Sequence, residues 1–96
     1  MDTQFYVYIL TNNHNNVLYV GSTGDLRERI YLHRNRYIPG FSKKYNLCKL
    51  VYYEACPNEA AALRREYQLK AGSRAKKIKL IESMAKPWED MFENIK

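Results

Sequence analysis

Two strand-like segments separated by an asparagine-rich turn near the N-terminus constrain the fold more than any other feature of the chain. Residues 5–11 form a nearly continuous run of β-branched and aromatic side chains, which favours a β-strand. Residues 12–16 include four asparagines, a composition typical of turns. Residues 17–21 form a second short run that ends in glycine. Together the segments predict a β-hairpin with a loop of four or five residues.

Successive side chains of a strand point to opposite faces, so the residues of the hairpin separate into two sets. On the first strand the sets are Phe5, Val7 and Ile9 on one face, and Tyr6, Tyr8 and Leu10 on the other. On the second strand Tyr19 lies opposite Val20. A pairing register that brings Tyr8 near Tyr19 agrees with this pattern, although the sequence does not fix the register.

A helix and a third strand follow the hairpin. Ser22 or Thr23 is placed to cap a helix that runs through residues 25–33 to about Arg36. Pro39 and Gly40 then break the chain into a loop. Residues 47–55 again combine apolar and aromatic side chains and predict a strand.

The second half of the chain is mainly helical. Residues 59–71 are rich in Ala, Leu, Glu and Arg and predict a strong helix, opened by Asn58 and ended by Gly72. Ser73 caps a further helix that includes residues 78–81. A last short helical turn is expected at residues 86–88, with Pro87 at its start.

The order strand, strand, helix, strand, helix, helix indicates an α+β domain in which helices cover a small sheet. Ninety-six residues are typical of one domain, so the prediction is a single domain over residues 1–96. Its core is expected at about residues 5–81, with residues 82–96 as a short C-terminal extension. A chain of this length has little room for a separate recognition module.

Positive charge is concentrated in the middle of the chain. Residues 27–79 contain fourteen Lys or Arg and four Glu, a net charge of +10 for this segment. Such a basic block favours polyanions, because phosphate contacts release condensed counterions. A solvated basic surface explains the same pattern equally well. Charge alone therefore leaves nucleic-acid binding at even odds.

Composition also bears on the compartment. No apolar run approaches the roughly 20 residues that span a bilayer, and the polar N-terminus has no signal-peptide pattern. Cys48 and Cys56 form neither a CxxC pair nor a metal-ligand set with the two histidines. We expect reduced thiols, no membrane association and a cytoplasmic protein.

Chemistry-bearing side chains recur on the two main helices. Arg29 and His33 are four residues apart, so they share one helix face, where a guanidinium could hold phosphate oxygens. Glu66 lies on the second helix beside Arg64 and Arg65. Taken singly, each of these residues is explained as well by a surface ion pair or a partly buried histidine.

The ordered set of Tyr6-Val7-Tyr8, Tyr19-Val20-Gly21, Arg29, His33 and Glu66 resembles the GIY-YIG nuclease domain, from about Phe5 to Ile81. The resemblance implies a three-stranded antiparallel sheet flanked by helices, in the order β-β-α-β-α-α. It also implies that Tyr8, Tyr19, Arg29, His33 and Glu66 are catalytic, with Glu66 as the only protein ligand of Mg²⁺ or Mn²⁺. The small stand-alone bacterial GIY-YIG proteins are the most similar group.

The tyrosines need a physical explanation, because a phenol with a pKa near 10 is a poor base at neutral pH. Tyr8 could act as the base if nearby cations lowered its pKa. It could also pass the proton through a neighbour such as His33. The division of work between Tyr8 and Tyr19 stays open.

Two departures from the family pattern are visible. Tyr6 stands where the first family motif has glycine, and Ile78 stands where many members carry an asparagine downstream of the glutamate. Gly21 keeps the glycine of the second motif, which allows a close backbone approach.

The leading hypothesis is a metal-dependent endonuclease that hydrolyses DNA, selects structure such as a branch or flap rather than sequence, and works in repair or recombination. A protein partner could supply specificity. The expected contacts to the DNA backbone are Lys43, Lys44, Lys70, Arg74, Lys76 and Lys77. The alternative is a catalytically inactive module of the same fold that binds nucleic acid or protein.

Overall fold

The computed structural model of the chain describes residues 4–35 and 44–95. Strands β1 (Phe5–Thr11), β2 (Leu18–Thr23) and β3 (Lys49–Cys56) form an antiparallel sheet in the order β2-β1-β3. The helices are α1 (Leu26–Arg34), α3 (Glu59–Ala71) and α4 (Arg74–Glu82), and a 3-10 helix, η1 (Phe92–Asn94), lies near the C-terminus. The predicted α+β class and the order β-β-α-β-α-α are confirmed.

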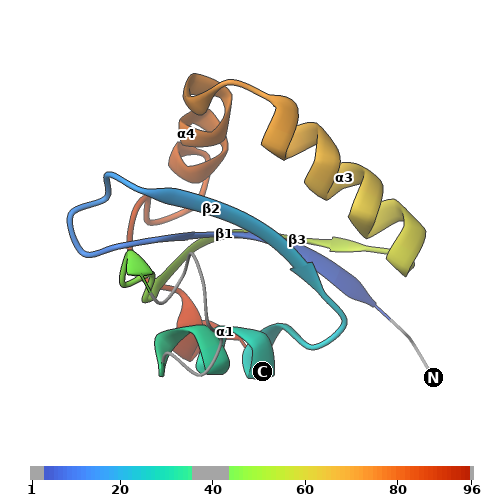
Figure 1. Cartoon of the computed structure of the whole chain (residues 1–96), viewed down its shortest axis with the longest axis horizontal. Coiled ribbons are helices and arrows are strands. Elements are labelled where there is room, and N and C mark those ends of the chain that lie inside the picture. Colours follow the sequence, from blue (N-terminus) through green and yellow to red (C-terminus); the bar gives the residue numbers. More distant parts are fainter. Residues whose placement is uncertain (1–3, 36–43, 96) are drawn as a thin grey trace.

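Helices cover both faces of the sheet. Figure 1 shows α3 and α4 on one face, and α1 together with the C-terminal segment on the other. The central strand β1 is therefore buried on both sides, and its residues 7–10 are inaccessible to solvent. Each such apolar side chain contributes roughly 1.5–3 kcal/mol on burial.

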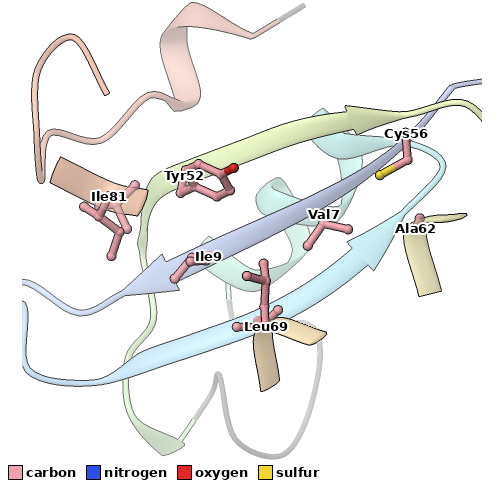
Figure 2. Packing of buried hydrophobic residues seen from close by; sticks show 9 residues of the cluster. Val7, Ile9, Tyr52, Cys56, Ala62, Leu69 and Ile81 are labelled. Carbon is pink, nitrogen blue, oxygen red and sulfur yellow. The ribbon is translucent and has the colours of Figure 1, made fainter. Parts of the chain in front are cut away.

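The two faces of β1 belong to two separate hydrophobic clusters. Under α3 and α4, Val7 and Ile9 pack with Leu69 and Ile81 (Figure 2). Under α1, the opposite set of side chains packs in a second cluster, whose buried members are Tyr8, Leu10, Leu26, Ile30, Leu47, Leu50, Phe92 and Ile95. The alternation predicted for the first strand is confirmed.

The pairing of β1 with β2 settles the register that the sequence left open. Tyr8 lies opposite Gly21, and Leu10 lies opposite Tyr19. Tyr8 and Tyr19 are thus diagonal neighbours on one face of the hairpin, with ring centroids 6.5 Å apart.

Three expected boundaries need correction. The second and third strands each begin and end later than predicted, at Leu18–Thr23 and Lys49–Cys56. Ser22 and Thr23 do not cap α1, because both pair with β1; Asp25 is the cap, and its side chain accepts a hydrogen bond from Glu28 N. The cap moves to Asp25 because β2 continues to Thr23, and Asp25 is the next residue whose side chain can accept a hydrogen bond from the first turn of the helix.

The helical turn expected at residues 86–88 is also wrong. Trp88 has a φ of 69°, outside the helical region, and Glu89 N donates to Lys86 O to close a simple turn. The helical piece near the C-terminus is η1 instead. The predicted caps of the other helices agree with the structure: Asn58 accepts from Ala61 N, and Ser73 accepts from Lys76 N.

The C-terminal segment binds α1 to the edge of the sheet. Asp90 Oδ1 accepts hydrogen bonds from Leu50 N at 3.0 Å and Phe92 N at 3.1 Å, while Oδ2 pairs with Arg34 at 2.8 Å. Met91 N also donates to Leu50 O at 2.8 Å. One carboxylate therefore joins β3, η1 and α1.

Phe92 adds an aromatic contact to the same junction. The guanidinium carbons of Arg27 and Arg34 lie 4.7 and 4.5 Å from the centroid of its ring. Arg27 also donates to the Ile95 carbonyl oxygen at 3.0 Å. Two turns of α1 are thus held against the C-terminal segment, which fixes the helix that carries Arg29 and His33.

Replacing Asp90 by alanine should lower the free energy of unfolding by about 1–3 kcal/mol, because two backbone N–H groups and a guanidinium lose a charged acceptor. Urea unfolding followed by circular dichroism measures the change. The matched control is Glu89→Ala, which removes an exposed acid from the neighbouring position and should stay within about 0.5 kcal/mol. Equal free energies of unfolding of the two variants would contradict the stabilising role of Asp90 between β3, η1 and α1.

Candidate active site

Three aromatic side chains from three elements meet under the hairpin. Tyr8 on β1 and His33 on α1 are buried, and Tyr8 Oη lies 3.1 Å from His33 Nε2. The His33 ring centroid is 5.9 Å from that of Tyr8 and 5.4 Å from that of Tyr19. The structure therefore brings together both motif tyrosines and the helix histidine.

Gly21 makes room for this cluster. A Cβ atom on Gly21 would lie 2.5 Å from Tyr8 Oη and 2.6 Å from Cζ, closer than such atoms approach in proteins. The phenol therefore lies over the β2 backbone, in space that only glycine leaves free. The close backbone approach expected at this position is made by a side chain of the chain itself.

Burial sets the protonation states of the cluster. Burial, followed by repulsion from Tyr19, raises the pKa of Tyr8 well above its usual 10, although Arg29 opposes the shift. Burial and the positive charge of Arg29 lower the pKa of His33 to about 4. At neutral pH Tyr8 is therefore a protonated phenol and His33 is a neutral imidazole. Of the two routes considered for Tyr8, the one that needs a lowered pKa disagrees with this environment.

His33 carries a further sign of a special position. Its Nδ1 atom is buried and has no hydrogen-bond partner among the residues that the structure describes. With the ring proton on Nδ1, Nε2 accepts a hydrogen bond from the Tyr8 hydroxyl; with the proton on Nε2, the direction is reversed. The first tautomer is the one in which His33 can take the proton of Tyr8.

Arg29 connects the aromatic cluster with Glu66. Arg29 is exposed on the surface of α1. The positive charge of Arg29 acts to lower the pKa of Tyr8, of His33 and of Glu66. For Tyr8 this effect is smaller than the opposite effect of burial. The guanidinium therefore acts on both halves of the site while remaining open to solvent, as a phosphate-binding group must.

Glu66 reaches the same region from the opposite face of the sheet. It lies on α3, and its Oε1 accepts a hydrogen bond of 2.5 Å from Ser22 Oγ on β2. Its Oε2 pairs with Lys70 Nζ at 2.6 Å. The sequence suggested an ion pair for Glu66 on the helix that carries Arg64 and Arg65; the pair is formed, but with Lys70, while Arg65 pairs with Glu54 on β3.

The environment keeps Glu66 ionised. Burial raises its pKa, but the hydrogen bonds from Lys70 and Ser22 and the charges of Lys70 and Arg29 outweigh burial. The pKa of Glu66 therefore lies below its usual 4.5. In the described part of the chain no group of three or more His, Cys, Asp or Glu is placed to hold a metal ion. Glu66 is an ionised carboxylate that could offer oxygen ligands to a metal here.

Ser22 is a site residue that sequence reasoning assigned to the wrong task. It was expected as a helix cap, yet it holds Glu66. A signal did exist: Ser22 is two residues after Val20, so it shares the face of β2 that α3 covers.

Four of the expected nucleic-acid contacts lie on α3 and α4. Lys70 pairs with Glu66, Arg74 donates to Asn16 O at 3.0 Å, and Lys77 donates to Gly72 O at 2.8 Å. Lys76 is exposed, as is Lys44 after the gap. Lys43 lies outside the described residues.

A cavity of about 400 Å³ opens between α3 and α4, away from the aromatic cluster. Leu69 and Leu80 are its apolar lining residues. The polar and charged lining residues are Arg65, Gln68, Lys76, Lys77 and Lys79, with no acid among them. The arrangement suits an anion with an apolar part.

Comparison with known proteins agrees with the geometry. The family model of the GIY-YIG catalytic domain matches residues 4–79. The chain belongs to the GIY-YIG family. In the described residues of this GIY-YIG protein, no helix is long and apolar enough to cross a membrane.

The relatives of this GIY-YIG protein include small bacterial proteins named UPF0213. One from Staphylococcus saprophyticus is 38% identical over 76 residues, which is 79% of this chain and 92% of the relative. One from Clostridium perfringens is 38% identical over 78 residues, 81% and 83% of the two chains. The solution NMR structure of the UPF0213 protein of Bacillus halodurans matches with a TM-score of 0.55 and 32% identity, over 90% of each chain.

Adding a methyl group at Gly21 should disrupt the cluster. Gly21→Ala is expected to lower the free energy of unfolding by about 1–3 kcal/mol, because Tyr8 must leave its place beside His33. Urea unfolding and the NMR shifts of the His33 ring report the two effects. Gly72→Ala is the control, since its Cβ would come no closer than 3.4 Å to other atoms. Unchanged His33 shifts in Gly21→Ala would contradict the close approach.

The lowered pKa of His33 makes stability depend on pH. Between about pH 6.5 and 4 the unfolded chain binds a proton on this residue that the folded chain excludes. Stability should therefore fall as the pH drops through this window, and His33→Gln should flatten that part of the profile. His14→Gln, at an exposed turn position, should keep the wild-type slope. An NMR titration tests His33 directly, and a midpoint near 6.5 would contradict the prediction.

Proposed function

We propose that this protein is a metal-dependent endonuclease that hydrolyses phosphodiester bonds of DNA. The observation that carries this proposal is the convergence around β2 of a phenol–imidazole pair, an exposed arginine and an ionised glutamate from three different elements. A proton acceptor, a phosphate-binding cation and a metal ligand are three groups that together promote hydrolysis of a phosphodiester. Membership of the GIY-YIG family supports the same reaction class.

The proposed proton route runs from water to Tyr8 and on to His33. Because its pKa is raised, Tyr8 is protonated at neutral pH and cannot act as a phenolate base. Neutral His33, 3.1 Å away, can accept the hydroxyl proton as Tyr8 takes a proton from the attacking water. Transfer in this order never leaves a free phenolate in the buried site. Tyr19, in ring contact distance of both, orients the water and shields it from bulk solvent.

Arg29 is proposed to hold the scissile phosphate. Its planar guanidinium offers two parallel N–H donors to non-bridging oxygens, which gain charge as the transition state forms. Because Arg29 also lowers the pKa of Tyr8, phosphate binding and proton transfer are coupled through one side chain.

Glu66 is proposed as the ligand of Mg²⁺ or Mn²⁺. The residue fits, because it is ionised, has hard oxygen donors and is fixed by Ser22. Mg²⁺ commonly uses one or two carboxylates and completes its coordination with water and substrate phosphate. When bound, such an ion would polarise the phosphate and stabilise the leaving oxygen.

DNA would follow the basic surface of α3 and α4. Lys70 and Arg74 lie on or beside the end of α3, and Lys76 and Lys77 line the cavity between the helices. Lys44, and Lys43 from the sequence, would extend this surface. Contacts to phosphates position a nucleic acid without reading its bases. We therefore propose branched or flap DNA in repair or recombination as the substrate class, with a protein partner refining the choice.

Replacing Glu66 by alanine should reduce cleavage by at least about a thousandfold, since a phosphate-polarising metal contributes several kcal/mol. Labelled duplex, single-stranded, flap and branched DNA would be incubated with Mg²⁺, Mn²⁺ or chelator, and products separated on gels. Glu82→Ala, an exposed acid on α4, is the control and should cleave normally. DNA affinity in chelator, measured by fluorescence anisotropy, should change little in either variant.

Cleavage that survives Glu66→Ala would exclude the metal role of this residue. Binding of all four DNAs without cleavage by the wild-type protein in any metal would exclude the nuclease proposal and favour a binding module.

A further inference from the structure

We propose that Lys70 is a resident counter-ion of Glu66 that leaves when a divalent cation binds and then contacts a DNA phosphate. The inference rests on the proposed function and adds a regulatory step to its metal site. Its basis is that both oxygens of the presumed metal ligand are already engaged, by groups of different kinds.

The two bonds of Glu66 differ in how firmly they are built. Ser22 lies within β2, so its hydroxyl is positioned by strand pairing with Val7. Lys70 lies one helical turn after Glu66 on α3, and 54% of its side chain is exposed. A flexible ammonium at the surface forms a weak ion pair, whereas the side chain of Glu66 is only 17% exposed. Lys70 can therefore leave while Ser22 keeps the carboxylate in place.

A divalent cation and the Lys70 ammonium compete for one position. Oε2 lies 2.6 Å from Nζ, so a divalent cation that approaches this oxygen meets a positive charge at close range. In the described residues no group of three or more His, Cys, Asp or Glu offers the ion another site. The ion pair therefore weakens the apparent affinity of Glu66 for metal, and its opening favours metal binding.

The released ammonium has a natural new partner. Lys70 lies one helical turn after Glu66 on α3, and a phosphate bound to the metal in the proposed reaction would lie near Glu66. With Glu66 neutralised by metal, a phosphate is the nearest anion of the substrate complex. Lys70 would then contribute to DNA binding only when metal is present. In the absence of metal, the same lysine keeps an unpaired carboxylate from repelling DNA.

Isothermal titration calorimetry with Mn²⁺ alone measures metal affinity and does not depend on DNA cleavage. Lys70→Met, which keeps the apolar stem, should bind Mn²⁺ about three- to tenfold more tightly than the wild type. Lys86→Met removes the same charge from an exposed position beyond α4 and should bind as the wild type does. Glu66→Gln should lose this binding. Equal affinity of Lys70→Met and wild type, with Glu66-dependent binding present, would overturn the inference and leave the proposed function intact.

The second arm measures the affinity for duplex DNA by anisotropy, in chelator and in Ca²⁺. Lys70→Met should lose about three- to tenfold in affinity with Ca²⁺ and change less than twofold in chelator. An equal loss in both conditions would show that Lys70 contacts a phosphate whether or not metal is bound. That result would overturn the proposed movement of Lys70 from Glu66 to DNA. Absence of Mn²⁺ binding to the wild type, to Lys70→Met and to Glu66→Gln alike would instead remove the metal site on which the proposed function depends.

Discussion

The register between β1 and β2 is the constraint on which the rest of the site depends. Tyr8 pairs with Gly21, so its ring can lie over a backbone that has no side chain in the way. A slip by one residue would turn Tyr8 to the opposite face, into the cluster beneath α3. The same register places Ser22 on that opposite face, within reach of Glu66. One pairing pattern therefore positions both a proton-transfer pair and a carboxylate.

A second constraint comes from the end of the chain. Asp90 and Phe92 hold α1 through Arg34 and Arg27, and the helix in turn carries Arg29 and His33. These contacts lie beyond residue 79, where the match to the family domain ends. The acidic C-terminal stretch thus has a structural use: its Asp90 satisfies backbone and guanidinium donors at the junction of sheet and helix. It is more than a solvated tail.

Sequence patterns predicted the parts of the fold that depend on local rules. The strand Phe5–Thr11 and the helix Glu59–Ala71 have the expected bounds, because their periodicity and caps are strong and unopposed. Predictions were wrong where tertiary contacts decide between two local options. Ser22 could cap a helix or extend a strand, and pairing with Val7 decided for the strand. Pro87 favoured a helical turn, but Trp88 adopts a positive φ and packs on the cluster beneath α4.

For the site, the ordered motif residues could be named from sequence, and His33 could be considered as a neighbour of Tyr8, 25 positions earlier. Nothing in the order of residues pairs Glu66 with Ser22, 44 positions earlier. The Ser22–Glu66 contact arises because α3 covers one face of the sheet, and the Tyr8–His33 contact arises because α1 covers the other. Protonation states likewise depend on burial, which a sequence does not report. The pKa of Tyr8 rises although a cation is near, because desolvation is the stronger effect.

The edge strand β2 divides the site into two environments with different physics (Figure 1). On the face of α1, burial keeps Tyr8 and His33 neutral, so neither group carries a charge before a proton moves. On the face of α3, hydrogen bonds keep Glu66 ionised, so it can hold a cation. The proposed reaction uses a neutral proton-transfer pair and an ionised carboxylate, and one dielectric environment does not favour both. The strand β2 lies between the two environments, and the positive charge of Arg29 lowers the pKa of groups on both sides of it.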